Sequence, residues 1–186
     1  QLIKTLETIR LWSRGDHDIT EQFPDIVDAA TTLPSQLILD GEILAGRPGH
    51  LQSFSDLQTR LNRKRITHNL LKTHPVFFRA YDVLRHDGKD IREKPLIYRK
   101  GVLATLAVNQ SPVIFPNTPE QIVAMRESAR EASAEGVMIK RQQSPYVSGR
   151  KVGHWWKWKL DPMTADCVLI YAQAGHGRRA SLHSDY

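Results

Sequence analysis

Apolar and polar residues alternate along several short stretches of the chain, and glycine and proline separate these stretches. The period of two predicts strands over residues 9–14, 36–44, 76–84, 135–141, 154–160 and 165–174. Apolar residues at helical spacing predict helices near residue 24, from residue 53, from residue 95 to about 107, and over 118–134. Because helices and strands do not alternate as regular β-α-β units, the pattern favours an α+β fold with largely antiparallel sheets.

The helix over 118–134 has the clearest local signals. Thr118 can cap its first turn, Pro119 suits that turn, and Gln121 completes a capping box. An apolar stripe at helical spacing then follows, formed by Ile122, Met125, Ala129 and Ala132. Ser53 and Asp56 have the same capping-box spacing at the start of an earlier helix.

The composition is that of a globular chain of about one domain. Of 186 residues, 40% are hydrophobic and 25% are charged, which excludes a disordered tail, a collagen-like repeat and a disulfide-stapled miniprotein. Cys167 is the single cysteine, so a reducing compartment is expected. No apolar run reaches the roughly 20 residues of a membrane span, and residues 1–14 lack a secretory signal. We therefore expect a cytoplasmic protein without a membrane partner, associated with the nucleoid if bacterial.

The net charge favours an anionic partner. Lysine and arginine number 26 against 20 acidic residues, a formal charge of +6, and such a surface attracts nucleic acid or nucleotides. A charge that serves solubility alone is the alternative. The sequence contains no glycine-rich phosphate loop, no dinucleotide fingerprint and no zinc-ligand spacing.

Two short segments carry polar groups at the ends or in the middle of predicted strands. Arg14 is the last residue of a predicted strand and precedes a glycine, where it can reach a ribose or phosphate or can simply be solvated. Asp40 and Glu42 lie two apart and therefore share a face. Two acids on one face can hold a sugar hydroxyl, an arginine or a hydrated metal, and ordinary surface acids are the equally simple alternative.

The strand over 76–84 combines aromatic and charged residues. Strict alternation places Phe77, Arg79, Tyr81 and Val83 on one face, and Phe78, Ala80, Asp82 and Leu84 on the other. For Phe77 and Phe78 core packing is the expected role. For Tyr81 both core packing and stacking on a purine base remain open.

The strands over 135–141 and 154–160 carry the strongest candidate for an anion site. Lys157 and Lys159 share one face of a strand that also holds three tryptophans, Trp155, Trp156 and Trp158. Two neighbouring ammonium groups repel each other unless an anion lies between them, so we interpret this face as a phosphate site. Glu135 begins the preceding strand beside apolar neighbours.

Taken in order, these segments resemble the motifs of the covalent nucleotidyltransferases, in particular of ATP-dependent DNA ligases. The matches are a Ser-Arg motif at 12–15, Asp-Gly-Glu at 40–42, aromatic-Asp at 78–84, Glu-Gly-hydrophobic-Lys at 135–140 and Lys-x-Lys at 156–159. The resemblance covers nearly the whole chain. It implies a nucleotidyltransferase (ATP-grasp-like) domain in which antiparallel sheets are flanked by helices.

The resemblance also implies a reaction. In this family a lysine attacks the α-phosphate of ATP and becomes lysyl-AMP, AMP passes to the 5′-phosphate of a nick, and the 3′-hydroxyl displaces AMP. The implied cofactors are ATP and Mg²⁺ (or Mn²⁺), and the implied partner is nicked duplex DNA. Phosphoryl transfer of this kind needs positioned cations more than a strong base.

The motif matches imply a role for each residue. Arg14 and Glu42 would bind the ribose, and Tyr81 would stack on adenine. Glu135 would contact the metal, while Lys157 and Lys159, the catalytic residues of this chain, would contact the α-phosphate. Arg99 and Arg150 lie in stretches that face phosphate in the family. Weaker candidates for DNA contact are Arg63, Lys64, Arg65 and Arg150, for which a solvated helix end is an equal explanation.

The chain departs from the family at the nucleophile, which belongs to a Lys-x-Asp-Gly motif. The chain has two Asp-Gly pairs, and the residue two positions before each, where the motif requires lysine, is Ile38 in one and Arg85 in the other. Lys4 does not fit the motif either, because Thr-Leu-Glu follows it. We therefore expect an N-terminally truncated adenylation domain over 1–162 that is inactive alone, followed over 163–186 by the first strand of an OB-type domain. A truncated sheet would leave residues 2–14 as an exposed edge, which predicts self-association.

Two alternatives remain open from the residues alone. The first is an RNA ligase or capping-type nucleotidyltransferase, because nothing in the motifs reads a 2′-hydroxyl. The second is a non-catalytic basic module that binds DNA in a salt-sensitive way without any effect of ATP.

Overall fold

The computed structural model describes residues 1–61, 63, 65–149, 151–162, 164, 166–175 and 181, and the backbone of 183–185. Its main sheet has the strand order β2 (Ile9–Leu11), β1 (Leu2–Lys4), β3 (Leu37–Arg47), β5 (Val76–His86) and β6 (Lys89–Asp90). β4 (His50–Leu51) pairs with β3, and β7 (Asn109–Gln110) pairs with β5. All these pairings are antiparallel except β5 with β7, as the sequence pattern predicts.

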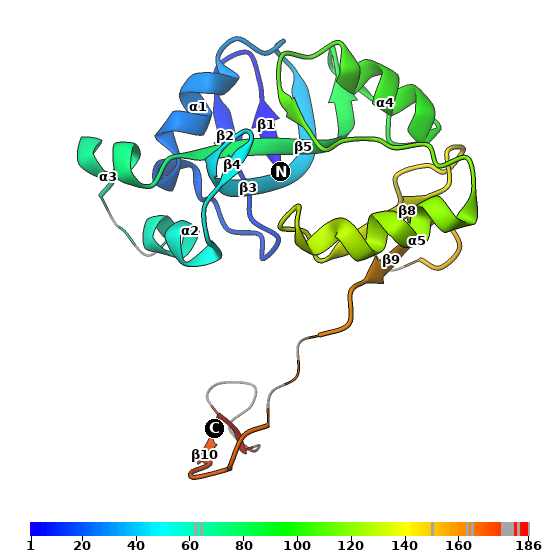
Figure 1. Cartoon of the computed structure of the whole chain (residues 1–186). Helices are drawn as coiled ribbons and strands as arrows, with labels where there is room; N and C mark the ends of the chain where they lie inside the picture. The colour runs from blue at the N-terminus through cyan, green and yellow to red at the C-terminus, as the bar shows by residue number, and fades with distance from the viewer. Residues whose placement is uncertain are drawn as a thin grey trace.

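The helices lie around this sheet and beside a separate hairpin (Figure 1). They are α1 (Pro24–Ala30), α2 (Phe54–Leu61), α3 (His68–Thr73), α4 (Leu96–Ala104) and α5 (Pro119–Glu127), with 3₁₀ turns at Thr20–Gln22 and Ser128–Arg130. β8 (Gly136–Lys140) and β9 (Trp155–Lys159) form the antiparallel hairpin, with α5 next to it. β10 (Gln173–Ala174) pairs with β11 (His183–Asp185) at the end of an extended segment.

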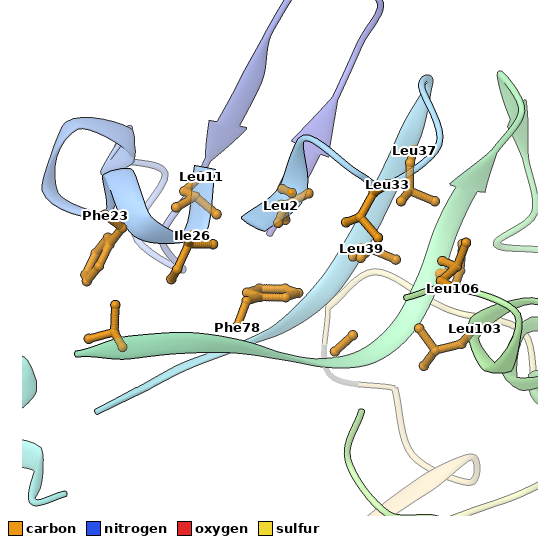
Figure 2. Close-up of a cluster of buried hydrophobic side chains, with 14 of the residues drawn as sticks. Leu2, Leu11, Phe23, Ile26, Leu33, Leu37, Leu39, Phe78, Leu103 and Leu106 are labelled. Atoms are coloured by element: carbon orange, nitrogen blue, oxygen red, sulfur yellow. The ribbon is translucent and has the colours of Figure 1, made fainter. Parts of the chain in front are cut away.

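The core lies between the main sheet and the helices α1 and α4. Figure 2 shows its side chains, among them Leu39 and Phe78 from the sheet, Ile26 from α1 and Leu103 from α4. Burial of such aliphatic and aromatic side chains contributes about 1.5–3 kcal/mol each. The opposite face of β3 and β5 stays free of this core and carries the polar residues described below.

Local sequence signals placed most elements correctly. Ser53 and Asp56 form the predicted capping box, with the Ser53 N–H donating to the carboxylate at 3.0 Å and the Asp56 N–H donating to the Ser53 hydroxyl at 3.2 Å. The Thr118 hydroxyl accepts from the Gln121 N–H, while the Gln121 side chain accepts from the Asn117 N–H rather than from that of Thr118.

Two predicted elements are shorter than expected. The α-helix predicted over 118–134 ends at Glu127. Of the four residues in its predicted apolar stripe, only Ala129 is fully buried, and Ala132 is exposed, so little packing holds the last turns in place. The strand over 165–174 is wrong except at Gln173–Ala174. Residues 168–171 are exposed, and in the described part of the chain no neighbouring strand pairs with their backbone groups.

The start of the chain is also different from the prediction. β1 lies inside the sheet between β2 and β3, so it does not form an exposed edge. β2 is the outer strand, and self-association remains a prediction for that strand alone. The Lys4 ammonium donates to backbone carbonyls at the C-terminal end of α1, which gives this lysine a structural role. Within the described ranges, no helix has the length and apolar character needed to cross a bilayer.

Candidate functional site

The first half of the site is the face of β3 and β5 that points away from the core. Asp40 and Glu42 share this face, and Glu42 lies directly across from Arg79 in the register of the two strands. Gly41 lets the strands approach, because a Cβ at this position would lie 2.3 Å from the Arg79 carbonyl oxygen. The glycine of the Asp-Gly-Glu segment therefore has a packing role between two candidate site residues.

Tyr81 reaches this face from a β-bulge. Asp40 pairs with Asp82 and Gly41 pairs with Ala80, so Tyr81 is the additional residue on β5. Its half-buried position, together with interaction with the Glu42 carboxylate, raises the pKa of the Tyr81 phenol above its ordinary value. The structure therefore brings Glu42 and Tyr81 together, as the motif matches imply.

The bulge overturns the predicted faces of Asp82 and Val83, after which a second register shift leaves Leu84 between the pairs Val83–Leu39 and Arg85–Ile38. Val83 was expected on the face of Tyr81, but it packs in the hydrophobic core opposite Leu39. Asp82 was expected with Phe78, but it lies across from Asp40. One additional residue in a strand exchanges the two faces beyond it, and nothing in the sequence marks where that residue is inserted.

The second half of the site is one face of the β8–β9 hairpin. The register places Lys140 across from Trp155, Met138 across from Lys157, and Gly136 across from Lys159, so these residues share a face. α5 covers the other face. Its Arg126 guanidinium lies 5.3 Å from the centre of the Trp158 ring and donates to the Lys159 carbonyl at 2.8 Å. The predicted common face of Lys157 and Lys159 is confirmed.

Lys159 already has an anion beside it. Its ammonium lies 2.5 Å from the Glu135 carboxylate, with the two side chains 59% and 82% exposed. This neighbour lowers the pKa of the Glu135 carboxyl. The predicted phosphate ligand and the predicted metal ligand are thus adjacent, and a phosphate that binds Lys159 competes with this ion pair.

Two residues near the site that sequence reasoning gave no role, Lys140 and Tyr146, lie close to Asp40. Burial raises the pKa of the Asp40 carboxyl, and the nearby Tyr146 hydroxyl and Lys140 ammonium offset this only in part. The Lys140 ammonium lies 4.0 Å from the centre of the Trp155 ring, and burial lowers the pKa of Lys140 despite the attraction of Asp82 and Asp40. The sequence alone did not indicate that Lys140 and Tyr146 lie near Asp40, because their positions depend on the strand register and on the path of residues 141–146.

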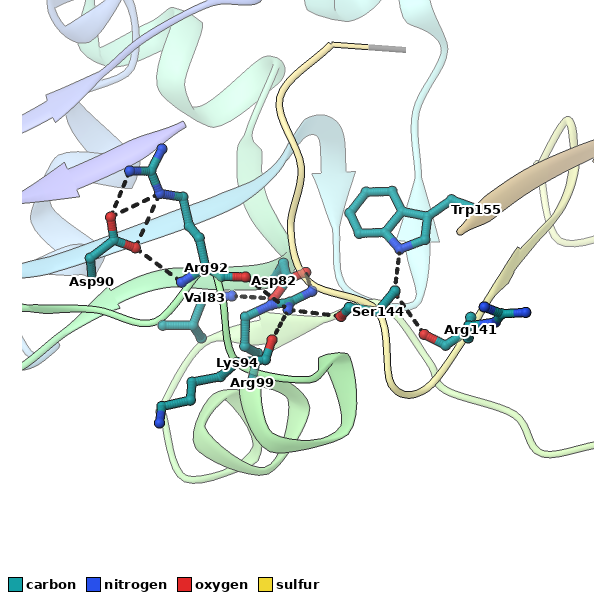
Figure 3. Close-up of polar contacts among 9 residues, drawn as sticks. All are labelled: Asp82, Val83, Asp90, Arg92, Lys94, Arg99, Arg141, Ser144 and Trp155. Carbon is teal, nitrogen blue, oxygen red and sulfur yellow. Dashed lines mark hydrogen bonds and ion pairs between the residues drawn. The ribbon is translucent and has the colours of Figure 1, made fainter. Parts of the chain in front are cut away.

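Arg99 is not available to a phosphate, contrary to the prediction. Its side chain and that of Asp82 are both 0% exposed and form an ion pair, with Arg99 Nε 2.8 Å from Asp82 Oδ1 and Nη2 2.9 Å from Oδ2 (Figure 3). Arg99 Nη1 also donates to backbone carbonyls, among them that of Ser144 at 3.1 Å. Arg99 lies in the first turn of α4, and nothing in the sequence around it indicated Asp82 as its partner.

The remaining candidates are peripheral or not described. Arg14 is exposed in the turn between Ser13 and His17, whose N–H and carbonyl are hydrogen-bonded across the turn. Arg63 and Arg65 are exposed beyond the end of α2. Lys64 and Arg150 lie outside the described residues. Across the described ranges, no group of three or more His, Cys, Asp and Glu side chains is arranged to hold a metal ion.

Comparisons with known proteins identify the family. Residues 1–159 match the model of the ATP dependent DNA ligase domain. A probable DNA ligase of Koribacter versatilis is 32% identical over 97% of this chain and 36% of its own length. A DNA ligase of Haloferax volcanii is 33% identical over 92% of this chain and 30% of its own length. The chain thus spans about a third of these curated relatives.

Solved structures agree in fold. The crystal structure of the ligase domain from M. tuberculosis LigD has a TM-score of 0.64 and 29% identity, covering 85% of this chain and 49% of that one. A mycobacterial DNA ligase D complexed with ATP and MES gives a TM-score of 0.64 at 28% identity. The fold is therefore the nucleotidyltransferase fold of a ligase domain. The chain belongs to the ATP-dependent DNA ligase domain family.

Proposed function

We propose that the protein to which this chain belongs is an ATP-dependent DNA ligase, and that this chain provides most of its nucleotide site. One observation carries the proposal. An aromatic side chain and a carboxylate, Tyr81 and Glu42, lie together on one sheet, and a hairpin linked to that sheet presents Lys157 and Lys159 on one face. A nucleotide needs both kinds of surface, apolar for its base and cationic for its phosphates.

On the base side, Tyr81 stacks on adenine and Glu42 accepts hydrogen bonds from the ribose hydroxyls. The position of Tyr81 supports this role, because its ring lies on the face away from the core and interacts with the Glu42 carboxylate. Arg14 is proposed as a second ribose ligand, although it is exposed in its turn and reaches the ribose only from the rim of the site.

On the phosphate side, Lys157 and Lys159 bind the α-phosphate and stabilise the negative charge that builds up during transfer. Glu135 is the proposed Mg²⁺ (or Mn²⁺) ligand. Mg²⁺ commonly takes one or two carboxylates together with substrate phosphates and waters, so a single exposed carboxylate beside a phosphate-binding lysine suits it. Glu135 would hold the metal, which would supply positive charge against the negative charge of the phosphates.

The reaction proceeds through three displacements at phosphorus. A lysine amine attacks the α-phosphorus and pyrophosphate leaves, giving lysyl-AMP. The 5′-phosphate of a nick then displaces the lysine, and the 3′-hydroxyl finally displaces AMP and closes the strand. None of the lysines in these 186 residues precedes an Asp-Gly pair at the required spacing, so the nucleophile is proposed to lie upstream in the full protein.

The nucleic acid is proposed to be nicked duplex DNA, because the curated relatives named above are DNA ligases. Arg63 and Arg65 are exposed and basic, and they are proposed as contacts to the DNA backbone together with Lys64 and Arg150. Residues 1–162 are proposed to be the adenylation domain, and 163–186 the start of the next domain, of OB type.

Titration of this chain with ATP tests the site. We expect weak binding that Tyr81→Ala reduces by about tenfold, since stacking on one base contributes about 1–3 kcal/mol. Tyr98→Ala is the matched control, because Tyr98 is exposed on α4. Equal affinities for the two variants would contradict the assignment of Tyr81.

Incubation with ATP labelled at the α-phosphate tests the missing nucleophile. With Mg²⁺ present, we expect no covalent label on this chain after denaturation at neutral or alkaline pH, where the phosphorus–nitrogen bond of lysyl-AMP survives. Label on Lys4 would contradict the proposal, because that ammonium is held by carbonyls at the end of α1.

A further inference from the structure

The main sheet and the β8–β9 hairpin are joined by one chain of buried polar contacts. Asp82 on β5 pairs with Arg99 on α4, and Arg99 Nη1 donates to the Ser144 carbonyl at 3.1 Å. The Ser144 hydroxyl in turn accepts from Trp155 Nε1, on β9, at 3.1 Å. We call Asp82, Arg99, Ser144 and Trp155 the junction. Asp82, Arg99 and Ser144 are fully buried. Figure 3 shows the four residues of the junction one after another between β5 and β9.

Backbone hydrogen bonds hold the same segment in place. The first free N–H groups of α4, at Leu96 and Ile97, donate to the carbonyls of Ser144 and Gln142 at 2.9 and 3.0 Å. In the reverse direction, the Tyr146 N–H donates to the Arg92 carbonyl at 2.7 Å. The segment between the hairpin strands therefore caps the helix that carries Arg99, and the two parts cannot shift without breaking several hydrogen bonds.

Each end of the junction adjoins one half of the proposed nucleotide site. Asp82 directly follows Tyr81 along β5. Trp155 shares a face of β9 with Lys157, two residues further on. The ring proposed to stack on adenine and the ammonium groups proposed to bind phosphate are thus connected through Ser144.

We propose that Ser144 and Trp155 are positioning residues, which hold the base side and the phosphate side of the site at the spacing that one ATP molecule requires. The inference rests on the proposed function. A ligand that spans two subsites gains affinity from their fixed spacing, whereas a ligand that occupies one subsite does not. Loss of the junction therefore weakens the binding of ATP and leaves the binding of adenosine alone, or of a polyphosphate alone, unchanged.

The test compares three ligands on the whole chain: ATP, adenosine and inorganic tripolyphosphate. Trp155→Phe removes the indole N–H that donates to Ser144. Ser144→Ala removes the hydroxyl, and with it both this bond and the one that the hydroxyl donates to the Arg141 carbonyl at 2.7 Å, within the hairpin segment itself. We expect each variant to lower ATP affinity about fivefold, as for one buried hydrogen bond, with adenosine and tripolyphosphate unchanged. The double variant should lose no more than either single variant, because both break the same link.

Matched controls come from the same segments. Ser148→Ala changes an exposed serine of the same loop, and Trp156→Phe changes a tryptophan on the opposite face of β9. Both are expected to bind all three ligands as the wild-type chain does. Unchanged ATP affinity in Ser144→Ala would overturn the inference, and so would an equal loss for all three ligands, which indicates local damage.

Hydrogen exchange without any nucleotide separates this inference from the proposed function. In Ser144→Ala we expect the Trp155 indole N–H and the Tyr146 amide to exchange about fivefold faster, because one buried bond that restrains them is gone. Unchanged exchange rates would overturn the junction as a restraint, whatever the ligand data show. If the wild-type chain binds none of the three ligands, the proposed function fails, and this inference fails with it.

Discussion

Replacing Arg99 by methionine should destabilise the fold far more than removal of an ordinary surface arginine. The substitution leaves the Asp82 carboxylate at 0% exposure with one remaining donor, the Val83 N–H at 2.9 Å. It also removes a donor to the Lys94 carbonyl and one of the two donors to the Ser144 carbonyl, which keeps the Leu96 N–H. Breaking a buried pair by removing one partner costs about 3–5 kcal/mol, a large share of the roughly 5–15 kcal/mol that stabilises a typical domain.

Urea denaturation measures this effect. With a slope of about 2 kcal/mol per molar urea, a loss of 3–5 kcal/mol lowers the midpoint by about 2 M. Arg92→Met is the matched control. Arg92 also pairs with an aspartate, Asp90, at 2.6 Å, but the two side chains are 48% and 45% exposed, so its loss should cost less than about 1 kcal/mol.

A second variant tests the reason for the loss. Asp82→Leu combined with Arg99→Met removes both charges, so no unpaired ion remains in the core, and part of the stability should return. The reasoning is refuted if Arg99→Met shifts the midpoint no more than Arg92→Met does. It is refuted equally if the double variant is as unstable as the sum of the two single changes.

Three further predictions concern packing, capping and pH. Gly41→Ala should cost about 3 kcal/mol in urea denaturation, since its Cβ would lie 2.3 Å from the backbone oxygen of Arg79; a neutral result would show that β3 and β5 can separate there. Lys4→Met should cost about 2 kcal/mol and speed amide exchange in α1, because its ammonium donates to the last carbonyls of that helix, the Thr31 carbonyl at 2.6 Å among them; unchanged exchange would contradict this. The pKa of Asp90 should be about 2 by NMR titration, because Arg92 donates hydrogen bonds to it, and Arg92→Met should raise it toward 3.8. Because the pKa of Asp90 is lowered in the folded state, the Asp90–Arg92 ion pair stabilises the fold fully above pH about 4, and this stabilisation is lost as the pH falls to about 2.

Much of the site could be read from the sequence because it depends on local periodicity. The common face of Lys157 and Lys159 follows from the period of a strand, and the same holds for Asp40 and Glu42. The order of the short motifs indicated the family, and the family match over residues 1–159 confirms it. These features need no knowledge of what packs against each strand.

Tertiary structure decided the rest, because each outcome depends on a partner distant in the chain. Pairing with β3 inserts the bulge at Tyr81 and so exchanges the faces of Asp82 and Val83. Asp82 then removes Arg99 from solvent, 17 residues away. The sequence around a charged residue does not indicate which residue will be its counter-ion, and the sequence of a strand does not indicate its register with the neighbouring strand. Both are fixed only when desolvation and backbone pairing select one arrangement of the whole chain.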